Sequence, residues 1–283
     1  MALFSMIASA KSYANVEYGN AGGSSLEFDA SVPDGQGPYP AVVIVHGGGW
    51  VAGDRRRSVE PLFEPLSAAG FAWFSISYRL ANVSDPSSIP SNIASMAGLG
   101  AAVDDVRQAV AYIKKHASEY RIDPDRIALV GESAGAQLAS MAALKPESAG
   151  PVQAVVAFYC PSDLAKLLET NPRIPPAVRQ MIQGSPLGDL LLANLRELSP
   201  VNWVQRDSPP FLMIHGTDDR LVPFEQSKQM CDAMRTAGAN CEVYPVTGGG
   251  HGMRWWESER DLTGYKKAMV RWLDSKLRAT TEK

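Results

Sequence analysis

Short apolar runs alternate along the chain with segments of helical periodicity. The runs at 41–45 and 127–130 are continuous, which is typical of central strands in a parallel sheet covered on both faces. Between them, Val103, Val106 and Val110 recur at helical spacing. This alternation predicts an α/β fold with a mainly parallel central sheet flanked by helices.

The same pattern gives the bounds of the other elements. The run at 26–32 alternates apolar and polar residues, which predicts a strand at an edge of the sheet. Asp123-Pro124-Asp125 predicts a turn. The predicted strands are 26–32, 41–45, 72–78, 127–130, 154–159, 211–215 and 241–246, and the predicted helices are 59–69, 101–120, 134–143, 223–237 and 262–273.

Two segments interrupt this rhythm. The segment 81–100 is rich in Ser, Asn and Pro and predicts a long loop. The segment 161–210 holds short helical pieces broken by prolines, which predicts a small cap inserted over the functional site. We expect a single domain over 25–283, preceded by an extension at 1–24.

Gly131-Glu132-Ser133-Ala134-Gly135 is a G-x-S-x-G motif between a predicted strand and a predicted helix. This setting is the one that a nucleophile elbow requires, because a tight turn lifts the serine hydroxyl above the sheet. The helix N-terminus also favours developing negative charge. The alternative is an ordinary glycine-rich turn with an unreactive serine. The context favours Ser133 as a nucleophile.

A glycine-rich segment, His46-Gly47-Gly48-Gly49-Trp50, follows the predicted strand 41–45. Glycines let the backbone approach a ligand closely and aim N–H groups at it. Such donors stabilise an oxyanion where a carbonyl is attacked. A phosphate-binding loop would need a lysine and a following helix, and neither is present here, so the segment predicts an oxyanion hole.

The chain has four histidines from which the base for the serine can come. His46 belongs to the glycine segment, His116 falls on a predicted solvated helix face, and His215 ends a strand as a structural histidine would. His251 lies in a glycine-rich loop after the last predicted strand, from which a side chain can reach over the sheet. We therefore expect His251 to be the base.

The acid that orients this base should follow the strand 211–215. Asp218 and Asp219 both lie in that loop, and spacing alone does not choose between them. Either choice gives the chain order Ser, Asp, His that is typical of α/β-hydrolases.

Five motifs together resemble the hormone-sensitive-lipase-like and bacterial acetyl or feruloyl esterase branch of the α/β-hydrolase superfamily. The resemblance runs from about residue 40 to 255 and implies the α/β-hydrolase fold. It implies Asp219 as the acid and the backbone N–H groups of Gly48, Gly49 and Ala134 as oxyanion donors, with Gly47 as a substitute for one of them. The motifs are 46–50, Ser77-Tyr78-Arg79-Leu80, 131–135, His215-Gly216-Thr217-Asp218-Asp219 and Gly250-His251-Gly252.

The sequence also departs from the pattern of that branch. The segment 81–100 is longer than usual, and Ala136-Gln137 stands where relatives often have Gly-His. Trp50, Tyr159 and Trp255 lie beside motif residues, so we expect them to bind substrate, although aromatic residues near a site often belong to the core. The expected pairing of Arg79 is with Asp104 or Asp105.

Together these features predict a serine carboxylesterase that hydrolyses short-chain acyl or aryl esters, including acylated plant polysaccharide, through an acyl-enzyme. Alternatives on the same fold are an arylformamidase, a serine exopeptidase and a non-catalytic ligand receptor. The receptor is disfavoured because all three triad residues are present. The short cap favours small acyl groups.

Composition narrows the class of protein further. The formal net charge is −3 and no extended Lys/Arg cluster occurs, which disfavours nucleic acid as a partner. Arg55-Arg56-Arg57 is expected to be a solvated loop. No apolar stretch reaches the roughly 18 residues of a membrane span. We expect neither a metal nor an organic cofactor, and the sequence leaves the oligomeric state open.

The three cysteines and the first residues bear on the compartment. Cys231 and Cys241 fall on a predicted helix and the next strand, so a disulfide and two buried thiols are both compatible with the sequence; Cys160 is the third cysteine. Ala8-Ser9-Ala10 has the form of a signal-peptidase site but follows only a short apolar run without positive charge. Secretion or periplasmic export is favoured if this is a signal remnant, and a cytoplasmic protein otherwise.

Overall fold

The computed structural model of the protein describes residues 9–81, 99–170, 180 and 184–278. In this part of the chain, eight strands form one sheet in the order β1-β2-β4-β3-β5-β6-β7-β8. Pairing is antiparallel from β1 to β2 and from β2 to β4, and every later pair is parallel. The predicted mainly parallel α/β architecture is therefore confirmed.

The bounds of the elements follow the predicted pattern closely. The strands are β1 (Ala10–Ala21), β2 (Ser24–Pro33), β3 (Tyr39–Val45), β4 (Ala72–Ile76), β5 (Ile122–Glu132), β6 (Ala154–Phe158), β7 (Phe211–Gly216) and β8 (Cys241–Val246). The helices are α1 (Phe63–Ala68), α2 (Leu99–Lys115), α3 (Ala134–Leu144), α4 (Leu164–Thr170), α6 (Pro186–Glu197), α7 (Glu225–Ala237), α8 (Met253–Trp256) and α9 (Gly264–Leu277), with 3₁₀ turns η1 (Glu60–Leu62), η3 (Glu147–Ala149), η4 (Pro200–Trp203) and η5 (Arg260–Leu262).

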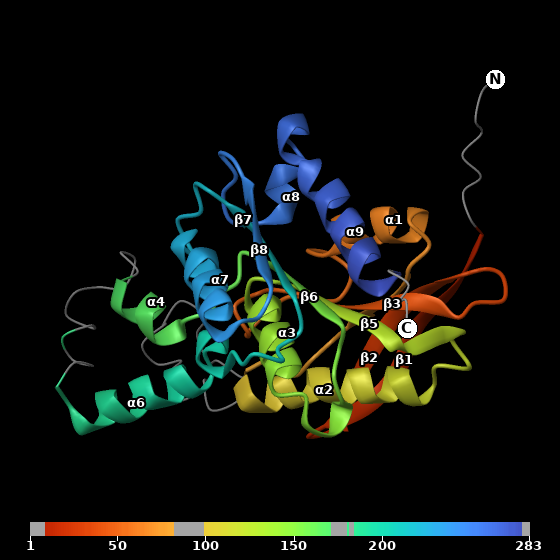
Figure 1. Cartoon of the computed structure of the whole chain (residues 1–283). Helices are drawn as coiled ribbons and strands as arrows, with labels where there is room; N and C mark the ends of the chain where they lie inside the picture. Colours follow the sequence, from red (N-terminus) through yellow and green to blue (C-terminus); the bar gives the residue numbers. More distant parts are fainter. Residues whose placement is uncertain (1–8, 82–98, 171–179, 181–183, 279–283) are drawn as a thin grey trace.

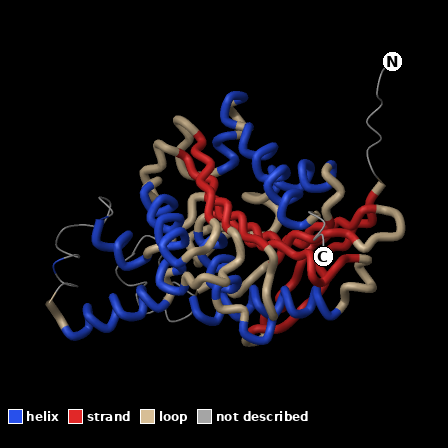
Figure 2. Tube along the Cα trace, in the orientation of Figure 1, coloured by secondary structure: helices blue, strands red, loops and turns tan. Residues whose placement is uncertain are grey.

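Helices cover both faces of the sheet. Figure 1 shows α2, α3 and α7 on one face and α1, α8 and α9 on the other, and Figure 2 shows the strands as a twisted layer between them. Residues of β3 and β5 contribute to both core clusters, one on each face. This explains their continuous apolar runs, because side chains that point to either face are buried.

Two predictions about the first half of the sheet are wrong. Residues 10–21 form β1 and pair with β2, so the domain includes most of the segment expected to be an extension at 1–24. β2 is consequently the second strand and not an edge. The turn predicted at 123–125 falls within the bounds of β5, where Asp125 N–H donates to Asp123 Oδ1 at 2.9 Å and the register against β3 shifts between Tyr39 and Ala41.

Part of the predicted cap is visible as α4 and α6, which lie at the left of Figure 1, beyond α7 and α3. Leu164, Leu191 and Leu195 bury their side chains in a small separate core, against which Trp50 packs. The cap therefore rests directly on the segment that follows β3. The predicted loop at 81–100 and the middle of the cap fall largely outside the described residues.

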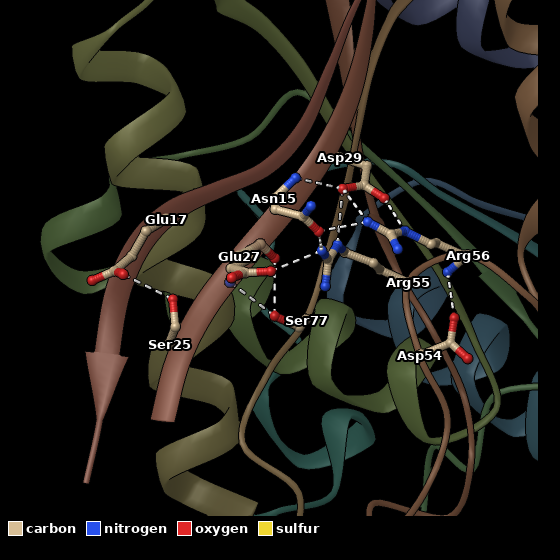
Figure 3. A network of polar contacts seen from close by, with 9 residues as sticks. All are labelled: Asn15, Glu17, Ser25, Glu27, Asp29, Asp54, Arg55, Arg56 and Ser77. Atoms are coloured by element: carbon tan, nitrogen blue, oxygen red, sulfur yellow. Dashed lines mark hydrogen bonds and ion pairs between the residues drawn. The ribbon is translucent and has the colours of Figure 1, made fainter. Parts of the chain in front are cut away.

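Two of the three arginines expected to form a solvated loop are paired with acidic residues of β2. Arg55 pairs with Glu27 and Asp29 of β2, and its side chain is only 13% exposed. Arg56 also pairs with Asp29, while Arg57 stays exposed. Figure 3 shows this network joining the Arg55–Arg56 loop to β1 and β2. The loop is thus fixed to the antiparallel part of the sheet.

Two pairings that the sequence left open are resolved. Arg79 donates from Nε to Asp105 Oδ2 at 2.8 Å, whereas Asp104 pairs with Arg107. Cys231 and Cys241 form a disulfide between α7 and β8, with Cα atoms 5.0 Å apart. Cys160 is a buried free thiol, and burial raises its pKa to about 12.

Candidate active site

Ser133 stands at the turn between β5 and α3, as predicted. Its backbone has φ 50° and ψ −121°, a strained conformation for a residue with a side chain. Its N–H donates to Phe158 O of β6 at 2.9 Å, which fixes the turn against the sheet. A Cβ at Gly135 would lie 2.2 Å from His46 O, so only glycine lets the turn approach the segment after β3. Ser133 therefore has the geometry of a nucleophile elbow.

His251 lies between Ser133 and Asp219. Its Nε2 is 2.9 Å from Ser133 Oγ, and its Nδ1 is 2.7 Å from Asp219 Oδ2. Because an ionised carboxylate only accepts hydrogen bonds, Nδ1 carries the proton and Nε2 is left free to accept from the serine hydroxyl. The three residues come from the ends of β5, β7 and β8 and form a continuous hydrogen-bonded line.

Asp219 is held by four donors. Its Oδ1 accepts from the backbone N–H groups of Leu221 at 2.8 Å and Val222 at 2.9 Å. Its Oδ2 faces His251 and also lies 3.3 Å from His215 Nε2. Burial alone would raise the pKa of Asp219, but the hydrogen bonds from His215, His251 and Val222 outweigh it and hold the pKa well below its usual range. The carboxylate is therefore charged wherever the imidazole can act.

Asp218, the other candidate acid, points elsewhere. It is exposed, and its Oδ1 accepts from Thr217 Oγ1 at 3.2 Å. The structure thus brings Asp219, and not Asp218, to the histidine.

The segment after β3 supplies backbone donors beside the serine. Gly48 and Gly49 have φ 120° and 61°. A Cβ at Gly48 would lie 2.0 Å from Ala52 O, so the tight turn requires glycine. Within the described residues, the N–H groups of Gly48, Gly49 and Ala134 have no hydrogen-bond acceptor. They are available to a ligand oxygen.

Gly47 is not available in the same way. Its N–H donates to Glu132 Oε1 at 3.0 Å, within the core. The interpretation that Gly47 could replace one of the other donors is therefore not supported by this geometry.

The three aromatic residues expected to bind substrate have different surroundings. Trp50 is half-buried and donates from Nε1 to Gln137 Oε1 at 3.0 Å, between the glycine segment and the cap. Tyr159 is fully buried behind His251, and its hydroxyl donates to Glu132, so it does not reach the substrate side. Trp255 is 56% exposed. Trp255 lines an open pocket beside His251.

That pocket lies on the His251 side and has a volume of about 550 Å³. Trp255 and Leu221 supply apolar surface, whereas Asp218 and Arg220 supply charged groups. The pocket is lined by Asp218, Arg220, Leu221, Gly248, Gly250, His251 and Trp255. Its mixed character suits a group that presents both an apolar face and polar substituents.

A family model matches most of this chain. The BD-FAE model covers residues 29–234, which include the second half of β2, all of β3 to β7, Ser133 and Asp219. The chain belongs to the BD-FAE family. This places it among the hormone-sensitive-lipase-like α/β-hydrolases and confirms the resemblance inferred from the motifs.

Two relatives of this BD-FAE protein are described as a probable carboxylic ester hydrolase and an esterase. The chain is 33% identical over 219 residues to the probable carboxylic ester hydrolase LipM of Mycobacterium tuberculosis, with 74% of this chain and 48% of LipM covered. It is 30% identical to the esterase LipQ of the same organism, with 72% and 48% covered. The chain thus spans about half the length of these curated relatives.

Solved structures agree with the fold. A truncated carbohydrate esterase from gut microbiota superposes with a TM-score of 0.73 at 26% identity, covering 96% of this chain and 98% of that chain. The thermophilic esterase Est2 of Thermogutta terrifontis gives 0.72 at 22% identity, covering 99% and 96%. At the latter identity the likeness shows the fold alone.

Sequence reasoning missed two buried residues of the BD-FAE site. His215 lies against the carboxylate of Asp219, and Glu132 bonds Gly47 and Tyr159. The signal for Glu132 was its place inside the G-x-S-x-G motif, where an acidic side chain follows directly on a buried strand.

No group of His, Cys, Asp and Glu residues in the described part of the chain could hold a metal ion. Of the helices that the structure describes, none is both long and apolar enough to span a membrane.

Proposed function

We propose that the protein is a serine carboxylesterase that uses Ser133, His251 and Asp219 as its catalytic triad. The observation that carries this proposal is the continuous line from Ser133 Oγ through His251 to Asp219, with both contacts under 3 Å. Nucleophile, base and orienting acid are thus within hydrogen-bond reach of one another. Membership of the BD-FAE family and the esterase names of the relatives support the same chemistry.

In this mechanism, Ser133 Oγ attacks the ester carbonyl carbon while His251 Nε2 takes its proton. The N–H groups of Gly48, Gly49 and Ala134 stabilise the oxyanion of the tetrahedral intermediate. His251 then gives the proton to the leaving alcohol, and an acyl group stays on Ser133. Water attacks this acyl-enzyme by the same steps and releases the acid.

The leaving alcohol must lie on the side of His251, because this residue protonates it. The open pocket beside His251 is therefore the site we assign to the alcohol portion, with Trp255 as a flat contact for a ring. An aryl group or a sugar ring suits such a surface, and one structural relative is described as a carbohydrate esterase. We propose small acyl groups, of acetyl to about butyryl size, joined to aryl or sugar alcohols, including acylated plant polysaccharide.

The triad is tested by Ser133→Ala. We expect ester turnover to fall by on the order of 10⁴-fold or more, because removal of a triad member removes the covalent route. The control is Ser118→Ala. Ser118 is exposed and lies just after the C-terminal end of α2, so this variant should retain activity. A folded Ser133→Ala protein with near-normal turnover would overturn the assignment.

The same assay across p-nitrophenyl esters of increasing acyl length, with acetylated xylan and methyl ferulate, tests the substrate class. Fast cleavage of long-chain emulsified triglycerides would contradict the preference for small acyl groups.

A further inference from the structure

A buried chain of hydrogen bonds connects the two halves of the site. Met253 N–H donates to Tyr159 Oη at 3.1 Å, and Tyr159 Oη donates to Glu132 Oε2. The other carboxyl oxygen, Glu132 Oε1, accepts from Gly47 N–H at 3.0 Å. The chain therefore runs from the residue that starts α8, two positions after His251, to the residue that precedes Gly48.

Each member of this chain is fixed by burial. Tyr159 is fully buried and Glu132 is 6% exposed. Burial, with the adjacent carboxylate as a second cause, raises the pKa of Tyr159 well above its usual value, so its hydroxyl stays a donor. The ring of Tyr159 also meets the His251 ring edge-on, with centroids 4.6 Å apart. Tyr159 thus contacts the base through its ring and the glycine segment through Glu132.

Stability alone explains this arrangement poorly. A buried carboxylate carries a large desolvation cost unless it is paired, and no cationic side chain in the described part of the chain forms an ion pair with Glu132. Its two oxygens instead accept from two donors on different segments. A carboxylate suits this position because it accepts hydrogen bonds only and offers two separate oxygens.

We propose that Glu132 and Tyr159 are positioning residues that couple the oxyanion donors to the base. The inference rests on the proposed function of Ser133 and His251. In it, Glu132 sets the position of the Gly47–Gly49 backbone, and Tyr159 sets the position of the His251 loop. Both positions depend on the hydrogen bond between the Tyr159 hydroxyl and the Glu132 carboxylate. Loss of this bond should therefore increase the mobility of both the glycine segment and the His251 loop.

Tyr159→Phe tests the coupling while preserving the ring beside His251. We expect kcat to fall about tenfold with KM changed less than about twofold, because an aligned donor and base matter most in the transition state. The matched control is Tyr265→Phe, which also deletes a buried tyrosine hydroxyl bonded to a glutamate, Glu257, at 2.7 Å. The control should lose comparable thermal stability and keep its kcat.

Two further measurements separate this inference from the function on which it rests. A double-mutant cycle with Glu132→Gln should be non-additive, the double variant being little slower than the slower single variant. Amide hydrogen exchange should quicken at Gly47 in Tyr159→Phe, at the far end of the chain, and not in Tyr265→Phe. Exchange is measured without ester turnover, so it decides the coupling even if the wild-type protein hydrolyses no ester, a result that would end only the proposed function. Unchanged kcat in Tyr159→Phe, or unchanged exchange at Gly47, would overturn the coupling.

Discussion

At the scale of single residues, four neighbouring groups fix the position of the Asp219 carboxylate. Two backbone N–H groups fix Oδ1, and His251 and His215 face Oδ2. His215 is itself oriented, because its Nδ1 lies 2.7 Å from Ser227 Oγ and its Nε2 lies 2.9 Å from Val222 O. With two acceptors at Nε2, that nitrogen carries a ring proton and shares it between Val222 O and Asp219 Oδ2.

This arrangement predicts a large difference between neighbouring substitutions. Asp219→Asn should lower kcat by on the order of 10⁴-fold, because the amide cannot hold His251 in the tautomer with a free Nε2. Asp218→Asn should cost no more than a fewfold, because the Asp218 side chain is exposed and contacts Thr217. Steady-state rates with p-nitrophenyl acetate at pH 8 compare the two variants. A larger loss in Asp218→Asn would reverse the assignment of the acid.

The three residues of the proposed triad, which the structure brings into contact, were predictable from the sequence for identifiable reasons. Ser133 and His251 were found from local context, since glycines and a strand end mark both. Asp219 was separated from Asp218 only by the resemblance to a family, because adjacent residues differ in direction and not in composition. Tyr159 was misjudged as a substrate contact, because its full burial depends on Trp256 and Phe158 packing around it, which no local pattern shows.

At the scale of elements, β1, β2 and the loop that carries Arg55 and Arg56 are joined by one polar network (Figure 3). Asp29 is its centre, since it pairs with both arginines and accepts from Asn15 N–H at 2.8 Å. Burial alone would raise the pKa of Asp29, but the hydrogen bonds from Arg56 and Asn15 and the charge of Arg55 lower it to about 2. The Arg55–Arg56 loop follows the glycine segment in the chain, so the network restrains the C-terminal end of that segment.

A lowered pKa makes this network a pH-dependent source of stability. The contribution of Asp29 is fully present above its unfolded pKa of about 4 and is lost as the pH falls toward 2. Asp29→Asn should therefore lower the free energy of unfolding by on the order of 1–2 kcal/mol at pH 7, with the difference from wild type shrinking below pH 4. Urea unfolding at pH 7, 5 and 3.5 measures it.

The control for this prediction is Asp232→Asn, whose carboxylate pairs with Arg235 on the exposed face of α7. An exposed pair of this kind should contribute about 0–0.5 kcal/mol at any pH. An equal loss in both variants would mean that the network adds nothing beyond ordinary surface pairs.

A second connection between elements runs through Gln137 on α3. Its Oε1 accepts from Trp50 Nε1 at 3.0 Å, and its Nε2 donates to Leu198 O at 2.8 Å, just after the cap helix α6. Gln137 is fully buried. One side chain therefore connects the glycine segment to the cap.

Gln137→Leu should remove both bonds at similar volume and leave two partly buried polar groups, Trp50 Nε1 and Leu198 O, unpaired. We expect kcat/KM for p-nitrophenyl acetate to fall about three- to tenfold, because Trp50 directly follows Gly49, the oxyanion donor that we propose. Gln153→Leu is the matched control, since Gln153 accepts a hydrogen bond from Ile127 N–H in the middle of β5, away from Trp50 and the cap. Equal losses in the two variants would show that only general stability had changed.

Most elements were predictable because the central strands are buried on both faces and therefore consist of continuous apolar runs. β1 was missed because its register against β2 shifts between Tyr13 and Val16, and Asn15 there has φ 54°. A bulge of this kind breaks the two-residue period on which strand prediction depends. The Arg55–Arg56 network was missed because its acidic partners are distant in sequence.

At the scale of the whole molecule, a disulfide links two elements in the last third of the chain. The disulfide joins Cys231 of α7 to Cys241 at the start of β8, and β8 leads into the loop of His251. The sequence left this pairing open, because spacing shows that a helix precedes a strand but not how closely the two cysteines approach. Disulfides persist in oxidising compartments, so the bond favours the exported alternative over the cytoplasmic one.

The disulfide should stabilise the fold without being needed for the chemistry. By the chain-entropy relation, closing a loop with a sequence separation of 10 contributes about 2–3 kcal/mol. The His251 loop has other supports, since Trp256 Nε1 donates to Gly250 O at 2.9 Å and Met253 N–H donates to Tyr159. Dithiothreitol should therefore lower the melting temperature of the wild-type protein, leave kcat at 25 °C nearly unchanged, and have no effect on a Cys231→Ala/Cys241→Ala variant. Thiol titration of the unfolded, unreduced protein should find one reactive thiol, that of Cys160; three reactive thiols would remove both the bond and the support it gives to export.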